Sequence, residues 1–76
     1  MPHVIVKLLT GRSEQQKARL AAQVTKVVME CANCAENSVS VSIVDIASAD
    51  WVEKVYQPDI VGNPDTLYKK PGYNPL

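Results

Sequence analysis

The fold of this chain is constrained most strongly by the order of its segments, which are a short strand, a long helix and a second short strand. Residues 2–9 form an apolar, strand-like run, and Gly11 then permits a turn. Residues 38–46 alternate valine and isoleucine with serine, which is typical of a half-buried strand. Two strands separated by such a helix predict a β-α-β unit, whose strands run parallel through a right-handed crossover.

The helix between the strands has a start signal and an apolar face. The segment Ser13-Glu14-Gln15-Gln16 predicts a capping box, in which the serine and the glutamine each cap the other's backbone N–H. Apolar side chains recur at three- and four-residue spacing until the helix ends near Cys34, and polar side chains fall on the opposite side. The apolar face comprises Leu20, Ala21, Val24, Val27, Val28 and Cys31.

One β-α-β unit is too small to enclose a core. The chain has 76 residues and is expected to be a single α/β (α+β) domain, 1–76, with a core at 2–48 and a C-terminal helical arm at 49–76. At this size a single core barely offsets the entropy of ordering the chain. Because two strands also leave sheet edges uncovered, we expect a homo-oligomer, most simply a homodimer.

The arm is expected to contain two short helices separated by prolines. Ser48 or Asp50 could cap the first helix, which carries Trp51 and stops near Pro58. The second opens at 64–70 with proline in its first position. The arm is too irregular for a core and too apolar for a free tail, so we expect it to pack on the partner subunit.

Composition argues against several classes of function. Eight Lys/Arg balance eight Asp/Glu, and the basic residues are dispersed, so no nucleic-acid footprint is visible. There is neither an apolar stretch long enough to span a membrane nor a secretion signal, so we expect a cytoplasmic protein with no membrane partner. One histidine and two cysteines do not visibly supply a zinc site, and we expect no metal.

Pro2 is the candidate catalytic residue. If Met1 is removed, Pro2 becomes a secondary amine at the start of a strand, and it is then the only backbone nitrogen able to act as a base. An ordinary α-amino group titrates at about 7.7–8.0, and burial or a nearby cation lowers that value toward the one a general base needs. The alternative is that Pro2 only aids removal of Met1 and starts the strand.

Three other residues could serve a site, and each has a structural alternative. Arg12 could bind a carboxylate through paired hydrogen bonds, or it could be a solvated turn arginine. Trp51 could wall an apolar pocket or belong to the core. His3 could orient the amine or a substrate, or it could face solvent or an interface.

Cys31 and Cys34 form a lone CxxC motif. A redox CxxC works at the start of a helix, where the helix dipole lowers the thiol pKa, whereas this pair closes a helix. We therefore expect buried structural cysteines, with a small redox protein as the alternative.

Several of these features together resemble the 4-oxalocrotonate tautomerase superfamily. They are Pro2 opening a strand, the segment 9–17 at the strand–helix junction, the alternating segment 38–41, and Trp51. The segment 69–73, together with tryptophan in place of the family's phenylalanine, resembles more particularly the dimeric bacterial PptA-type branch.

This resemblance implies a tautomerase-like fold and an isomerase that moves a proton between enol and keto forms without a cofactor. By position, Pro2 matches the catalytic base, Arg12 the arginine that holds a substrate carboxylate, and Trp51 the aromatic wall. The family's second arginine falls at Ser40, as the resemblance suggests for the dimeric branch. A small monocarboxylate enol with an apolar or aromatic end is therefore the expected substrate.

Three other functions remain open at this point. Within the same fold, a hydratase or dehalogenase would use the proline as an acid, although it usually needs more cationic help than Arg12 provides. Outside it, the chain could be a non-catalytic dimerisation module or a small CxxC redox protein.

Overall fold

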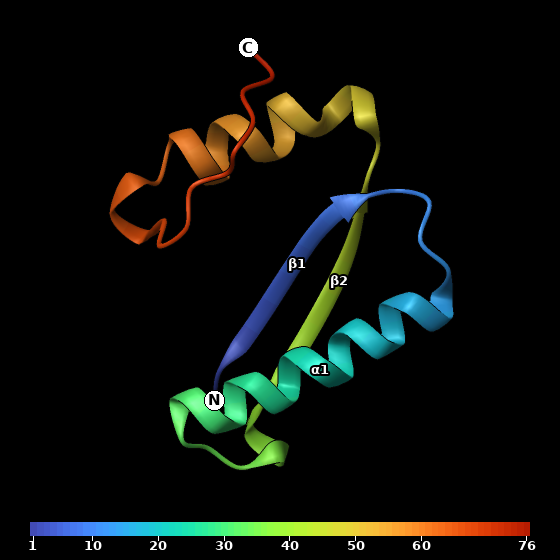
Figure 1. The fold of residues 1–76 in the computed structure, drawn as a ribbon, viewed down its shortest axis with the longest axis vertical. Helices are drawn as coiled ribbons and strands as arrows, with labels where there is room; N and C mark the ends of the chain where they lie inside the picture. The colour runs from blue at the N-terminus through green and yellow to red at the C-terminus, as the bar shows by residue number, and fades with distance from the viewer.

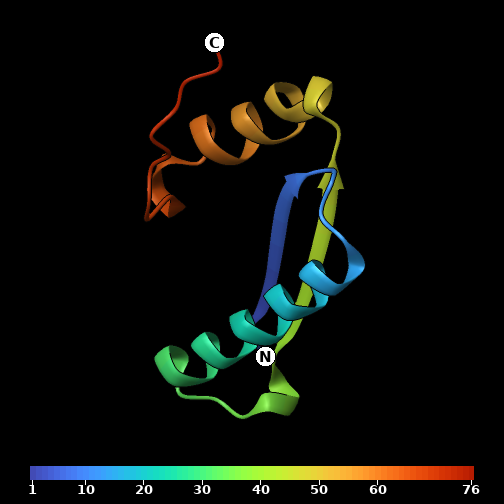
Figure 2. The same ribbon diagram turned by 45° about the vertical axis from the view of Figure 1, so that its right-hand side comes forward.

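The computed structural model describes residues 1–76 and contains the predicted β-α-β unit (Figure 1). Strand β1 spans His3–Leu9, helix α1 spans Glu14–Ala32, and strand β2 spans Ser40–Ile46. The two strands form a parallel sheet and pair along their whole length. The α+β fold class is therefore as predicted. The C-terminal segment leaves β2 and lies apart from α1 at the other end of the strands (Figures 1 and 2).

Helix α1 begins at the predicted capping box. The Ser13 hydroxyl accepts a hydrogen bond from the Gln16 N–H at 3.1 Å, and the Gln16 side chain accepts one from the Ser13 N–H at 2.8 Å. The helix ends at Ala32, slightly before the predicted Cys34. It stops there because Asn33 adopts the left-handed conformation, with φ of 54°, and a helix cannot continue through it.

The two faces of the sheet are identified by one ion pair each. The Lys17 ammonium of α1 lies 3.0 Å from Asp45. Strand residues whose side chains point to the same side of the sheet as Asp45 therefore face the helix. Hydrogen bonds to Asp45 and then to Glu14 raise the pKa of Lys17 above its ordinary value. Lys7 pairs instead with Asp59 in the C-terminal segment. We call the side of the sheet to which Lys7 points the arm face. It consists of His3, Ile5, Lys7 and Leu9 of β1 and Ser40, Ser42, Val44 and Ile46 of β2.

The arm differs from its predicted form. A single 3₁₀ turn, Ser48–Asp50, leads through Trp51 into a π-type helix at Val52–Val61, so the prediction of a helix ending near Pro58 was wrong. A proline disrupts an α-helix because it lacks an N–H and its ring meets the carbonyl four residues earlier. Here the helix runs through Pro58 in the wider π-type form, in which N–H groups bond to the carbonyl five residues earlier.

Two smaller predictions about the arm were also wrong. No side chain caps the turn at Ser48–Asp50 or the helix that follows, so neither Ser48 nor Asp50 has the predicted capping role. The second predicted helix is only the 3₁₀ turn Pro64–Thr66, which ends well before residue 70, although its proline does lie at the start. None of the helices is both long and apolar enough to span a bilayer.

The end of the arm folds back on its own chain, and its packing on a partner subunit stays a prediction. The indole N–H of Trp51 donates a hydrogen bond to the Tyr73 hydroxyl at 2.9 Å. The ring of Tyr73 also lies 5.8 Å from that of Tyr56, centroid to centroid. Tyr56 is one of only two buried residues, so the arm builds a small core of its own around the π-type helix.

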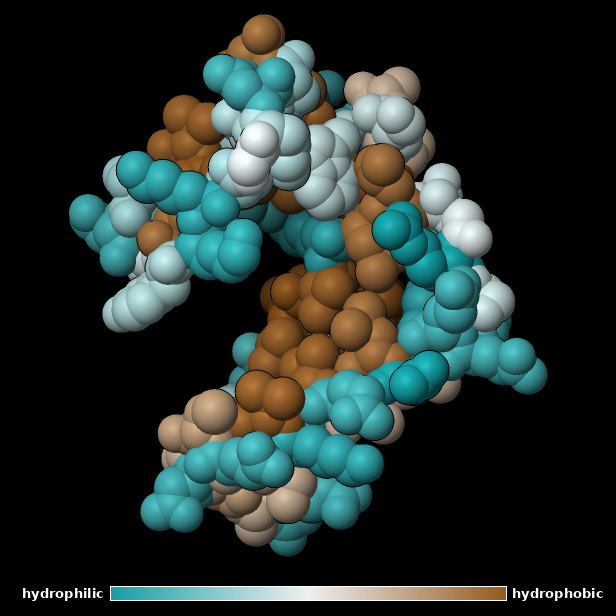
Figure 3. Space-filling model, in the orientation of Figure 1, coloured by the Kyte–Doolittle hydropathy of each residue, from teal (hydrophilic) through white to brown (hydrophobic).

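The single chain buries very little of its surface. Only Val55 and Tyr56 are buried, and the chain exposes 5830 Å². A compact monomer of this mass is expected to expose about 4,600 Å². The radius of gyration is 13.8 Å, against about 11.4 Å for a compact domain of this length. Apolar side chains lie uncovered over the strands, in the notch between α1 and the C-terminal segment (Figure 3).

The predicted apolar face of α1 is only partly covered, and the cysteines are not buried. Leu20, Ala21 and Val28 are half-buried, as is Val24. Val27 and Cys31 are exposed, and Cys34 is half-buried. The prediction of buried structural cysteines is therefore wrong for the single chain, because Cys31 lies on an exposed part of α1 and Cys34 lies beyond its end.

Candidate active site

Pro2 lies at the end of the sheet where both strands begin. It is half-buried, and its carbonyl accepts a hydrogen bond from the Ser40 N–H at 3.1 Å. The preceding Met1 ammonium donates to the Ser38 carbonyl at 2.6 Å. The carbonyl of Pro2 is thus tied to the start of β2, and this tie does not depend on Met1.

Ser40 and His3 lie next to Pro2 and contact each other. They are register partners in the parallel sheet, and the His3 Nδ1 lies 2.6 Å from the Ser40 hydroxyl oxygen. From the sequence, His3 could orient the amine or a substrate, or face solvent or an interface; in the structure it is exposed and bonded to Ser40. The only signal for this contact is the pairing register, which places residues 3 and 40 side by side, and a single sequence does not reveal it.

Arg12 lies at the opposite end of β1. Its guanidinium donates to the Leu9 carbonyl at 3.1 Å and is otherwise exposed. Strand β1 contains seven residues, which corresponds to about 23 Å of extended chain. Within one chain, Pro2 and Arg12 are therefore too far apart to hold the same small molecule.

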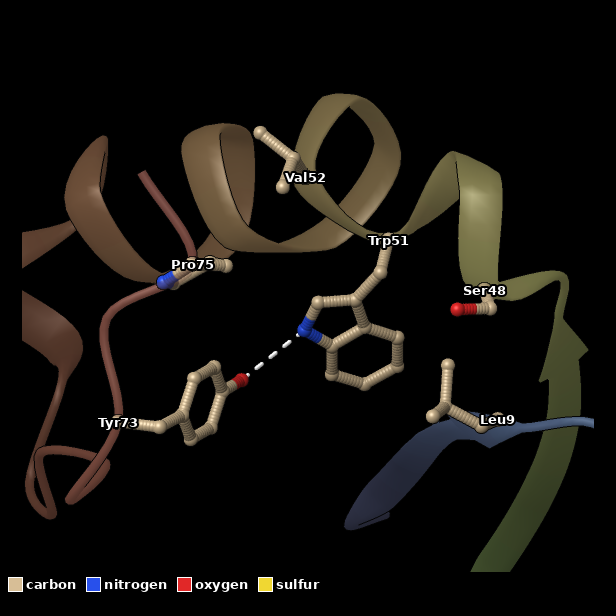
Figure 4. Close-up of a pocket in the computed structure, with 6 residues that line it drawn as sticks. All are labelled: Leu9, Ser48, Trp51, Val52, Tyr73 and Pro75. Atoms are coloured by element: carbon tan, nitrogen blue, oxygen red, sulfur yellow. Dashed lines mark hydrogen bonds between the residues drawn. The ribbon is translucent and has the colours of Figure 1, made fainter.

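Trp51 lines an apolar cavity near the Arg12 end of the sheet. The cavity has a volume of about 400 Å³, and in Figure 4 Trp51 and Tyr73 stand on either side of their shared hydrogen bond. Apolar side chains dominate the lining, and the Ser48 and Tyr73 hydroxyls are its polar groups. The lining residues are Leu9, Ser48, Trp51, Val52, Tyr73 and Pro75.

A second cavity links Trp51 to the middle of β1. It has a volume of about 460 Å³ and lies on the arm face, between β1 and the π-type helix. Its strand residues are Ile5 and Lys7, and Ile5 is two positions from His3 on the same face. The arm face therefore carries polar groups at the Pro2 end and an apolar cavity walled by Trp51 further along.

The structure thus brings Pro2 and Ser40 together, places Trp51 along the same sheet, and leaves Arg12 at the far end. No three His, Cys, Asp or Glu side chains lie close enough to form a metal site. In chemical terms, the Pro2 end offers a hydroxyl and an imidazole, and removal of Met1 would add a secondary amine; these groups are suited to proton transfer. The Arg12 end offers an anion-binding group beside an apolar wall.

The chain matches known proteins over most of its length. Residues 2–55 match the family model described as tautomerase enzyme, and the match begins at Pro2. A probable tautomerase from Xylella fastidiosa (strain 9a5c) is 40% identical over 76 residues, covering 100% of this chain and 93% of the relative. Tautomerase PptA from Escherichia coli (strain SMS-3-5 / SECEC) is 36% identical over 75 residues, covering 97% of this chain and 99% of the relative.

Solved structures agree with the sequence matches. A 4-oxalocrotonate tautomerase isozyme from Methylibium petroleiphilum superposes with a TM-score of 0.64 at 32% sequence identity, covering 66% of this chain and 81% of that one. The chain therefore belongs to the tautomerase enzyme family, as a PptA-like member of the 4-oxalocrotonate tautomerase superfamily.

Proposed function

We propose that this tautomerase converts the enol form of an arylenolpyruvate or related 2-hydroxy-dienoate into its keto form, with the amine of Pro2 as the base and no cofactor. The observation that carries the proposal is the position of Pro2. It stands at the start of β1, where its carbonyl accepts a hydrogen bond from the Ser40 N–H. A base held in place in this way can act repeatedly on one bound substrate.

The reaction needs only one group that accepts and returns a proton. The unprotonated Pro2 amine takes the proton of the enol hydroxyl, and the released O–H electron pair forms the C2=O bond. The electrons of the C2=C3 double bond then take a proton from the Pro2 ammonium at C3. The amine ends in its starting state, and no electrons are gained or lost overall.

Arg12 is proposed to bind the substrate carboxylate, with the arginine supplied by a second copy of the chain. Pro2 and Arg12 lie at opposite ends of one β1 strand, which supports a site shared between copies rather than one within a single chain. A two-fold arrangement that brings the Pro2 end of one chain to the Arg12 end of another would complete two identical sites.

We expect the protein to be a homodimer, or a larger homo-oligomer, at micromolar concentration. The surface exposed beyond that of a compact monomer is about 1,200 Å², which is within the range buried by each subunit of an obligate dimer. Sedimentation equilibrium measures the mass directly, and a monomer would contradict the expectation. Removing residues 62–76 should weaken association, because this segment carries exposed apolar side chains, including Tyr68 and Leu76.

Substrate choice should favour an aromatic monocarboxylate over a dicarboxylate. With Ser40 instead of an arginine beside Pro2, a second substrate carboxylate lacks a charged partner, which costs about 1.5–3 kcal/mol, or 10- to 150-fold. A phenyl ring against Trp51 gains burial and about 0.5–1.5 kcal/mol of aromatic contact. We therefore expect a higher kcat/KM for phenylenolpyruvate than for 2-hydroxymuconate on one preparation. The reverse preference would show that another cation serves the second carboxylate.

The proposed function is tested by ultraviolet assay of enol-to-keto conversion, with mass spectrometry of the same sample. A retained Met1 would turn the Pro2 nitrogen into an amide, which cannot act as a base. Turnover by protein that lacks Met1, and none by protein that retains it, is the expected result. Equal turnover by both forms would overturn the role of Pro2.

A further inference from the structure

The contact between His3 and Ser40 is the strongest feature that the proposed reaction leaves unexplained. The His3 Nδ1 and the Ser40 hydroxyl oxygen are 2.6 Å apart, and both residues are exposed at the Pro2 end of the arm face. An exposed hydrogen bond of this kind adds little to folding stability. Its position beside the candidate base suggests a different use.

Building on the proposed function, we propose that His3 is a positioning residue that aims the Ser40 hydroxyl at the substrate's C2 oxygen. In this arrangement His3 Nδ1–H donates to the Ser40 oxygen, and the serine's own proton is then free to be donated to the substrate. The C2 oxygen becomes more negative as Pro2 removes the enol proton, and a hydrogen bond aimed at it is strongest at that moment.

The proposed direction of this hydrogen bond follows from the chemistry of a hydroxyl. A serine side chain has a single proton to donate and can accept two hydrogen bonds. If Ser40 donated its proton to His3, none would remain for the substrate. If it accepts from His3 instead, its proton is free and its orientation is restricted by the imidazole.

The backbone holds this pair in a constant position relative to Pro2. Residues 3 and 40 are partners in the sheet, and the Ser40 N–H is bonded to the Pro2 carbonyl at 3.1 Å. Ser40 thus bonds to Pro2 through its backbone N–H and contacts His3 through its side chain. A substrate oxygen within reach of the Pro2 amine would start close to the Ser40 hydroxyl.

Other charged groups on this face are already engaged. The Lys7 ammonium is paired with Asp59 of the π-type helix. The remaining neighbour on β1 is Ile5, which is apolar and 55% exposed. The charged residues of α1 that reach the sheet, such as Lys17, do so on the opposite face. His3 and Ser40 are therefore the polar side chains nearest Pro2 on the arm face.

The test compares four variants in the full-length processed protein, using phenylenolpyruvate as the substrate. Ser40→Ala should lower kcat by about 10- to 150-fold, the scale of a hydrogen bond to a charged group, with a smaller change in KM. His3→Leu should lower kcat in the same direction. His3→Asn should restore most of the loss, because its side-chain amide can place an N–H where His3 Nδ1 stands.

The double variant separates positioning from a merely structural role. If His3 acts through Ser40, adding His3→Leu to Ser40→Ala should lower kcat by less than about twofold further.

The outcomes distinguish this inference from the proposed function. An active wild type whose kcat is unchanged in both His3→Leu and Ser40→Ala overturns the inference and leaves Pro2 catalysis standing. Additive losses in the double variant overturn the claim that His3 acts through Ser40. A wild type with no turnover of the enol overturns both proposals.

Discussion

Replacing Pro2 with alanine in the processed protein is expected to lower kcat for enol-to-keto conversion by about 10²- to 10⁴-fold, the usual contribution of a positioned general base. Alanine keeps an amine at the start of β1, but it is a primary amine and its backbone is freer to rotate than that of proline. The loss would therefore reflect both the identity of the base and its placement, rather than removal of the group.

The measurement is a comparison of initial rates on phenylenolpyruvate, after mass spectrometry has confirmed that Met1 is absent from both proteins. Pro64→Ala is a matched control, because Pro64 starts an exposed 3₁₀ turn in the arm, away from the Pro2 end of the sheet. We expect the control to keep the wild-type rate. A Pro2→Ala protein with the wild-type rate would refute Pro2 as the base.

Replacing Arg12 with alanine should lower kcat/KM for a carboxylate enol by about 10- to 150-fold, which corresponds to 1.5–3 kcal/mol for a hydrogen bond to a charged group. In the single chain, Arg12 contacts only the Leu9 carbonyl through its side chain, so its loss should have little effect on folding. Arg19→Ala is the matched control, because Arg19 is also exposed but lies on α1. Equal values of kcat and KM in wild type and Arg12→Ala would remove Arg12 from the site.

Mixing the two inactive variants tests whether the site is shared between copies. If Arg12 serves the Pro2 of another chain, a mixed dimer of Pro2→Ala and Arg12→Ala contains one intact site. Random exchange in a two-fold dimer should then restore about a quarter of the wild-type activity. If both residues act within one chain, every site in the mixture lacks one of them, and activity should stay at the level of the separate variants.

The β-α-β core could be predicted because its signals are local. The capping box at Ser13 and Gln16, the alternation in β2 and the helical spacing of α1 each depend on residues close together in the chain. The arm was predicted less well, since the π-type helix at Val52–Val61 runs through Pro58. Its path depends on packing around Tyr56 and Tyr73, which are distant in sequence.

The sequence by itself determined the elements of the core and their order, and it supplied the residues proposed for the site: Pro2, Arg12 and Trp51. Hydrogen bonding within a helix and side-chain alternation in a strand are short-range effects that can be read from neighbouring residues. Which groups meet was decided only by the tertiary structure. The parallel register sets His3 against Ser40, because pairing between strands depends on long-range packing that no local pattern specifies.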